Sequence, residues 1–134
     1  MPEVFYNTEI LTLNYVKEEK LVIIEWKKNA TTKEYRNFIT SIIEFSKKNK
    51  VLYLMSDMRK EGVVNTEDIR WLKSEITSIA DELNEVKVAL IVADNQYSNI
   101  YAETLKRKFK ESPLQFNIFK DRVSAKSWLI ASSG

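Results

Sequence analysis

The sequence contains no cysteine and no histidine, and these two absences remove much of the usual chemistry of enzymes. Without cysteine there is no disulfide, no thiolate metal site and no cysteine nucleophile. Without histidine the chain lacks the commonest general base, the commonest zinc ligand and the only side chain that ordinarily titrates near neutral pH. A Ser–Lys pair stays open as a catalytic device, but the composition favours a protein that is not an enzyme and holds no metal or cofactor.

Glycine and proline are also scarce, with two of each in 134 residues. Loops must therefore be short and built mainly from Asn, Asp, Ser and Lys. Gly62 lies in the segment GVVNTED, which has the spacing of neither a P-loop nor a dinucleotide fingerprint. The longest apolar runs, such as LVII and VALIVA, are far shorter than the roughly 20 residues that span a bilayer. We therefore expect no phosphate-binding loop and no membrane span.

What the chain does contain is typical of one globular domain. Hydrophobic residues make up 44% and charged residues 30% of its 134 residues, which is enough to bury one core over residues 1–134. The segment MPEVFYNTEI at the N-terminus lacks the basic and apolar regions of a signal peptide, so a cytoplasmic location is expected. A formal net charge of +2 is too small to predict nucleic-acid binding. The basic clusters at residues 47–50 and 106–110 are typical of a helix end and a solvated helix face.

Hydrophobic residues recur along the chain with the spacing of strands and helices in turn. Alternation predicts a strand over residues 10–16, and the run LVIIEW predicts a second strand that forms a hairpin with the first. Thr31 and Glu34 have the spacing of a capping box and predict a helix start. The other predicted strands cover residues 51–55, 86–93 and 114–119, and the other predicted helices cover residues 69–83, 98–110 and 123–131.

The predicted order β-β-α-β-α-β-α-β-α indicates an α/β fold, with helices packed on a mixed sheet that is parallel in part. Functional residues of open sheets gather at the carboxyl ends of parallel strands. Asp57, Asp94 and Asp121 follow predicted strands. Aspartates at such positions can hold Mg²⁺ or a substrate hydroxyl, but they are also ordinary turn residues. Without a phosphate-binding loop we expect the turn role.

The segment after the third predicted strand resembles a known family. The strand runs to Asp57, a charged loop follows, and Asn65–Thr66 opens a helix. This arrangement resembles the SpoIIAA-like (STAS-like) superfamily, the anti-sigma-factor antagonists of bacteria. In that superfamily a central strand ends near an aspartate, and a partner kinase phosphorylates the serine of an Asp-Ser pair at a helix start. The resemblance makes Thr66 a candidate phosphorylation site.

Two further features resemble an uncharacterised bacterial branch of the same superfamily. They are the Trp–Leu pair at residues 71–72 and the segment AKSWL at residues 125–129. The resemblance spans roughly residues 9–131 and implies a regulatory domain that recognises a protein partner, or a second copy of itself as a homodimer. The surface it implies is the loop and helix start formed by Asp57, Arg59, Asn65, Thr66 and Trp71.

The helix start departs from the pattern of the superfamily in ways that bear on phosphorylation. Asn65 replaces the acidic residue, Thr66 replaces serine, and two acidic residues follow at positions 67–68, where the superfamily has small residues. The two carboxylates would repel an approaching phosphate and would themselves occupy the positive end of the helix dipole. The residues therefore favour an ordinary helix cap at Asn65 or Thr66 over a phosphorylation switch.

A second hypothesis places the function in a pocket beside the sheet. Met55 and Met58 flank the end of one strand, and Trp71 lies on the flank of the apolar face of the next helix. Flexible methionines and an aromatic residue at the edge of the core could line a pocket for a lipid or another hydrophobic small molecule, although they could equally fill the core. A deep apolar pocket would favour this hypothesis over a protein-binding surface, and a closed core would exclude it.

Overall fold

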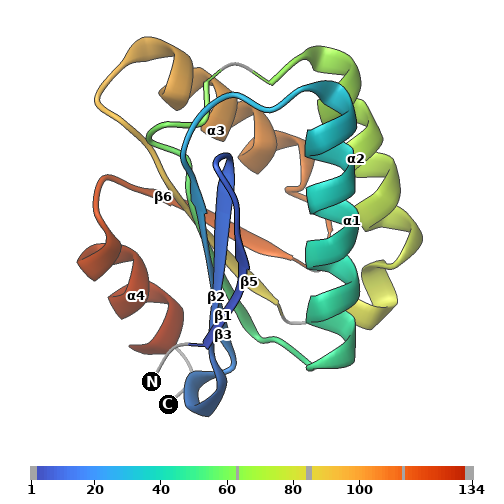
Figure 1. Cartoon of the computed structure of the whole chain (residues 1–134), viewed down its shortest axis with the longest axis vertical. Coiled ribbons are helices and arrows are strands. Elements are labelled where there is room, and N and C mark those ends of the chain that lie inside the picture. The colour runs from blue at the N-terminus through green and yellow to red at the C-terminus, as the bar shows by residue number, and fades with distance from the viewer. Residues whose placement is uncertain (1–2, 63, 84–85, 113, 132–134) are drawn as a thin grey trace.

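The computed structural model describes residues 3–62, 64–83, 86–112 and 114–131. Its strands form one six-stranded sheet in which each strand lies beside the next in the chain (Figure 1). The strands are β1 (Glu3–Asn7), β2 (Leu11–Val16), β3 (Leu21–Trp26), β4 (Tyr53–Asp57), β5 (Lys87–Ile91) and β6 (Gln115–Phe119). The helices are α1 (Thr32–Lys48), α2 (Thr66–Ser78), α3 (Gln96–Lys108) and α4 (Arg122–Ala131), with 3₁₀ turns η1 (Lys17–Glu19) and η2 (Ala80–Leu83).

The sheet is mixed, as the element order predicts. Strands β1, β2 and β3 pair antiparallel, and β3, β4, β5 and β6 pair parallel. Helices α1, α2 and α3 pack on one face of the sheet, and α4 packs alone on the other face (Figure 1). The carboxyl ends of β3, β4, β5 and β6 therefore lie side by side, next to the starts of the helices. We call this end of the parallel strands the carboxyl edge.

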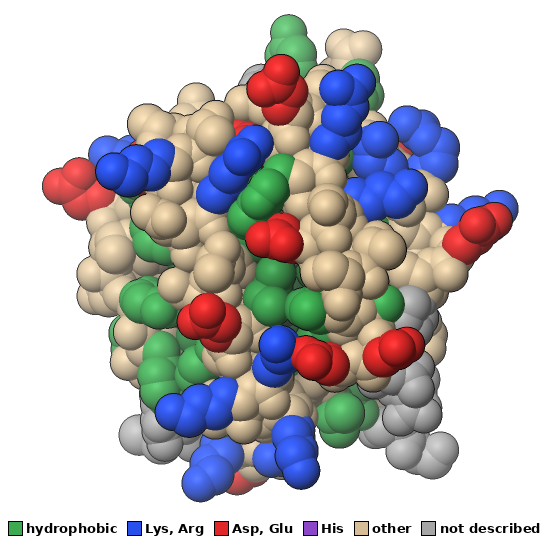
Figure 2. Space-filling view, turned by 90° about the vertical axis from the view of Figure 1, so that its right-hand side faces the viewer, with side chains coloured by type: hydrophobic (Ala, Val, Ile, Leu, Met, Phe, Trp, Pro, Cys, Tyr) green, Lys and Arg blue, Asp and Glu red, His purple; other side chains and the backbone are tan. Residues whose placement is uncertain are grey.

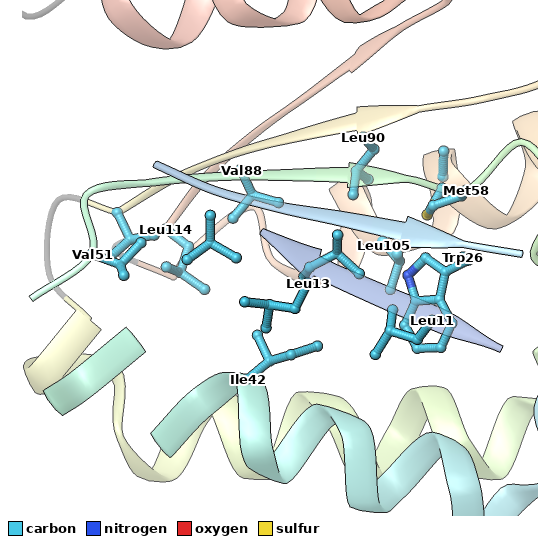
Figure 3. Close-up of a cluster of buried hydrophobic side chains, with 14 of the residues drawn as sticks. Leu11, Leu13, Trp26, Ile42, Val51, Met58, Val88, Leu90, Leu105 and Leu114 are labelled. Carbon is cyan, nitrogen blue, oxygen red and sulfur yellow. The ribbon is translucent and has the colours of Figure 1, made fainter. Parts of the chain in front are cut away.

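The two faces of β4 belong to two separate cores because side chains alternate along a strand. Leu54 and Ser56 face helices α1–α3, whereas Met55 packs with Leu129 of α4. The core under α1–α3 is the larger of the two, and Figure 3 shows side chains from the sheet and from the helices meeting in it. The central strand is thus covered on both faces, as its continuous apolar run predicts.

The capping box at the start of α1 is confirmed. The Thr31 hydroxyl accepts the Glu34 backbone N–H at 3.2 Å, and the Glu34 carboxylate accepts the Thr31 backbone N–H at 2.9 Å. The helix that Asn65–Thr66 is predicted to open begins at Thr66, but α2 ends at Ser78, before the predicted end at residue 83. The Glu82 N–H bonds the Ile79 carbonyl, so the chain continues as the tighter η2 turn.

Strand β1 is absent from the sequence prediction, which expects five strands. It pairs with β2 at the edge of the sheet, and its register shifts between Val4 and Tyr6. A bulge of this kind breaks the alternation by which strands are recognised. Phe5 nevertheless packs against α1, since the centroid of its ring lies 4.7 Å from the ring centroid of Phe45.

The surface formed by α1 and α2 carries both signs of charge, with hydrophobic side chains visible between the charged groups (Figure 2). Charge of one sign does not dominate this face. Within the described ranges, no helix combines the length and the hydrophobicity that a bilayer span requires.

Candidate functional site

Asp57 lies at the carboxyl edge of the sheet and is 4% exposed. One of its oxygens accepts the Arg59 Nε–H at 2.9 Å, and the other accepts Arg59 Nη2 at 2.6 Å and Arg122 Nε at 3.1 Å. Burial would raise the pKa of Asp57, but the hydrogen bonds from Arg59 and Arg122 outweigh burial and hold the pKa below its ordinary value. Because Arg122 is the first residue of α4, this carboxylate ties the end of β4 to the helix on the opposite face.

The other two aspartates of the carboxyl edge have separate roles. Asp94 is fully exposed and lies 3.9 Å from the Lys120 ammonium. Asp121 accepts the backbone N–H of Ser124 at 2.7 Å and so caps the start of α4. Among the described residues, acidic side chains do not gather in a group of three or more that could hold a metal ion.

The start of α2 is capped by Asn65. Its side-chain oxygen accepts the Asp68 backbone N–H at 2.8 Å, and its amide donates to the Thr32 hydroxyl at 3.2 Å. The Asp68 carboxylate is buried and accepts from Arg36 at 3.0 Å and from Thr32 at 3.1 Å. Thr66 is the first helical residue and is exposed. The cap and the candidate phosphorylation site are therefore different residues.

This division of roles predicts different costs for substitutions at the two positions. Asn65→Ala should lower the free energy of unfolding by about 1 kcal/mol, since it removes the cap. Thr66→Ala should change the free energy of unfolding by less than about 0.5 kcal/mol, as exposed substitutions usually do. Urea denaturation of the two variants measures both values. A loss at Thr66 as large as that at Asn65 would contradict the assignment of the cap.

Trp71 lies at the seam between α1 and α2. Its ring meets the Tyr35 ring edge to face, with centroids 6.4 Å apart, and the Arg36 guanidinium lies 5.3 Å from the Trp71 ring centroid. Since Arg36 also binds Asp68, Trp71 takes part in the contacts that hold α2 against α1. The side chain is half-buried.

A cavity of about 110 Å³ lies between the sheet and helices α1–α3. Its walls are almost entirely apolar, and Trp26, Met58, Val88 and Leu105, all labelled in Figure 3, belong to them. Apolar cavities of about 150 Å³ bind benzene, whereas pockets for drug-sized ligands start at about 300 Å³. The space therefore suits a molecule of about one ring.

One carboxyl group lines this apolar cavity. Glu61 is 3% exposed, and its Oε1 atom makes no hydrogen bond within the described structure. Burial raises the pKa of Glu61 to about 8, so the side chain is a neutral acid at pH 7. Tyr35 and Tyr101 also line the cavity, and their hydroxyl oxygens lie 3.4 Å apart. Burial, and after it the charge of Glu61, raises the pKa of both tyrosines.

The loop between β4 and α2 brings Glu61 inward. Its backbone N–H bonds the Met58 carbonyl at 3.1 Å. The next residue, Gly62, has φ +47°, a left-handed conformation that glycine adopts readily, and a side chain there would collide with Asn29. Glu61 and Tyr35 also border a smaller pocket of about 30 Å³, which is lined in part by Asn29 and Asp68.

Comparisons with known proteins bear on the fold. No protein-family model matches the chain, and no curated protein matches it in sequence. Among solved structures, it is similar to an uncharacterised protein of the DUF3478 family from Shewanella loihica PV-4, described as having a SpoIIAA-like fold. The TM-score is 0.58 at 14% identity, over 96% of this chain and 92% of that chain. The fold is SpoIIAA-like. At this identity the similarity concerns the fold alone.

Within this SpoIIAA-like fold the residues singled out in the sequence do not form one site. Arg59, Asn65 and Thr66 are exposed near the carboxyl edge, whereas Asp57 is buried beneath Arg59. Met55 packs under α4, so of the two methionines only Met58 lines the cavity. Trp71 packs at the edge of the larger core and is not among the residues that line the cavity.

Sequence reasoning missed Glu61, Tyr35 and Tyr101 as a group. Glu61 stands in a charged loop, RKEG, where an acidic residue is expected to face water. Tyr35 has the helical spacing of a core residue, and so does Tyr101. Glu61, Tyr35 and Tyr101 come together only because the loop folds over the side of the core formed by α1 and α3. No local sequence pattern therefore predicts the cluster.

Proposed function

We propose that this SpoIIAA-like chain is a non-catalytic binding domain whose ligand is a small, largely apolar molecule held between the sheet and α1–α3. The observation that carries the proposal is the apolar cavity within the larger core. At about 24 cal/mol per Å³, an empty space of 110 Å³ costs on the order of 2–3 kcal/mol. A ligand that fills the space recovers part of this cost and stabilises the folded state.

The size of the cavity narrows the ligand class. A volume of about 110 Å³ accommodates one ring or a short branched chain. It is too small for the long acyl chains of a membrane lipid. The sequence suggests either a lipid or another hydrophobic small molecule as the ligand. Because of the size of the cavity, we propose the small molecule.

The non-catalytic part of the proposal rests on the state of the acidic residues. Asp57 is occupied by two arginines, Asp121 caps a helix, and Asp94 is fully exposed. Glu61 lines the cavity beside two tyrosine hydroxyls. A lone neutral acid of this kind can bind and orient a ligand without assisting a reaction.

Filling the cavity from its wall tests the proposal. The Ser46 hydroxyl is buried without a partner in the described structure and lines the cavity. Ser46→Leu should occupy the space, abolish binding of a ring-sized probe such as methylcyclohexane, and leave stability unchanged or higher. The measurement is the change in methyl NMR signals of Ile42, Val88 and Leu105, which line the cavity, as the probe is added.

The matched control is Ser74→Leu, which adds the same side chain at an exposed position of α2. This variant should bind the probe as the wild type does. The proposal fails if the wild type shows no change in those methyl signals, or if Ser46→Leu still binds the probe.

We propose as a second function that Arg59, Asn65 and Thr66, which are exposed near the carboxyl ends of the parallel strands, help to recognise a protein partner or a second copy of the chain. The supporting observation is that Asp57 holds the Arg59 guanidinium in place through both of its oxygens while the Arg59 side chain stays 43% exposed. A preorganised guanidinium loses little entropy on binding. Native mass spectrometry of protein from its own cells tests this: a dimer or a phosphate on Thr66 supports it, and an unmodified monomer speaks against self-association and phosphorylation.

A further inference from the structure

The structure assigns the polar part of the ligand. We infer that Glu61 selects an electrically neutral molecule that carries one hydrogen-bond-accepting oxygen, such as a small cyclic ketone or ether, and donates a hydrogen bond to it from its protonated carboxyl. This inference deepens the proposed function and rests on it, because the cavity must be the binding site for Glu61 to choose the ligand.

The geometry leaves Glu61 in need of a partner. Buried polar groups of native proteins almost always have one, yet Oε1 of Glu61 makes no hydrogen bond within the described structure. The nearby hydroxyls of Tyr35 on α1 and Tyr101 on α3 lie 3.4 Å apart, so one can donate to the other while the accepting hydroxyl keeps its own proton. Glu61 is thus an acid that lines the cavity and has an oxygen without a partner in the described structure, so it is available to an oxygen of the ligand.

The charges around Glu61 exclude an anionic ligand. The titratable groups that face it are Tyr35 from α1, Tyr101 from α3 and Asp68 from α2. From the sheet, the residues that line the cavity are Ile24, Trp26, Leu54, Ser56, Val88, Leu90 and Phe116, none of which titrates. No lysine or arginine lines the cavity among the described residues. A carboxylate or phosphate would meet acids and apolar walls, with no cation to pair with.

A cationic ligand is disfavoured for a different reason. An ammonium group would have to lose its water and ionise Glu61 inside an apolar chamber, and a buried ion pair seldom repays the desolvation of both charges. A neutral oxygen requires neither change, because it accepts a hydrogen bond from the carboxyl O–H that the acid already carries at pH 7. The observations thus favour the neutral acceptor over the amine.

The test compares probes that share one ring. Methylcyclohexane has no polar group, cyclohexanone has a carbonyl acceptor, and cyclohexylamine is a cation at pH 7. Each is titrated into the wild type, Glu61→Met and Glu61→Gln, with the methyl NMR signals of Val88 and Leu105 as the readout. Comparing one probe across variants removes the differences in how readily the probes leave water.

Glu61→Met should weaken the binding of cyclohexanone about tenfold, which is the loss expected for one hydrogen bond. The affinity for methylcyclohexane should not change. In the wild type, cyclohexanone should bind about tenfold more weakly at pH 9 than at pH 7, because Glu61 gives up its proton near pH 8. Glu61→Gln keeps an N–H donor, so it should bind cyclohexanone without this pH dependence.

Each contrary result has a distinct meaning. Equal binding of cyclohexanone by the wild type and Glu61→Met, or a wild type that binds cyclohexylamine and binds it more tightly as the pH rises, would overturn the assignment of Glu61 while the cavity remained a binding site. A wild type that binds none of the three probes would overturn the proposed function together with this inference.

Discussion

Replacing Glu61 by glutamine is expected to stabilise the protein at pH 8, although the change removes an acidic residue from a loop rich in charge. The ordinary pKa of a glutamate is 4.5, and burial raises the pKa of Glu61 to about 8 in the folded protein. Between these values the folded protein keeps a proton that the unfolded chain has lost. The contribution of Glu61 to the stability of the wild type is therefore fully present below pH 4.5 and is lost as the pH rises to 8.

The slope of this loss is about 1.4 kcal/mol for each pH unit between the two pKa values. Glutamine does not titrate, so the difference in unfolding free energy between Glu61→Gln and the wild type should be small at pH 5 and several kcal/mol at pH 8. Urea denaturation at half-unit intervals of pH measures the difference.

The control for Glu61→Gln is Glu67→Gln, which makes the same change at an exposed position in the first turn of α2. Its stability should run parallel to that of the wild type over this pH range. If Glu61→Gln also ran parallel to the wild type, the carboxyl of Glu61 would not be buried in the way described, and its role in the cavity would fall with it.

Removing the carboxylate of Asp57 is expected to cause the largest loss of stability at the carboxyl edge. Asp57→Ala should lower the free energy of unfolding by about 2–3 kcal/mol at pH 7, because it breaks charge-assisted hydrogen bonds from Arg59 and Arg122. Both arginines are partly exposed and regain water, which keeps the loss below that of a fully buried pair. Urea denaturation at pH 7 measures it.

The pH dependence of Asp57 has the opposite sign to that of Glu61. Its pKa is held below the ordinary 3.8 in the folded protein. The stability it contributes is therefore present above pH 3.8 and is lost as the pH falls through the lower folded value. Acid unfolding of Asp57→Ala should lack this component. Asp94→Ala is the control, since Asp94 is fully exposed and should change stability by less than about 0.5 kcal/mol. Equal effects at both positions would contradict the account.

Much of the fold could be predicted because the hydrophobic patterns are long and regular. The run VLYLM predicts a strand covered on both faces, and the structure places Met55 under α4 and Leu54 under the other helices. Thr31 and Glu34 predict the start of α1. Strand β1 escapes prediction because its bulge interrupts the alternation on which the prediction depends.

The candidate site could be predicted only in part. Met55 and Met58 are three residues apart, and side chains at an odd separation along an extended chain face opposite sides of the sheet. This alternation alone would have placed the two methionines on opposite faces. The choice between Asn65 and Thr66 as the cap depends on one residue of helix phase, which sequence does not resolve. The burial of Glu61 depends on how its loop meets α1 and α3, and that is tertiary information.

The most direct test of the central claim is a crystal structure of the protein soaked with cyclohexanone. The account predicts electron density for one ring between the sheet and α1–α3, in contact with Val88 and Leu105, with the ketone oxygen within hydrogen-bond distance of the Glu61 carboxyl. A core in which neighbouring side chains have closed the cavity, or a probe found only on the protein surface, would contradict the claim that this fold holds a small ligand there.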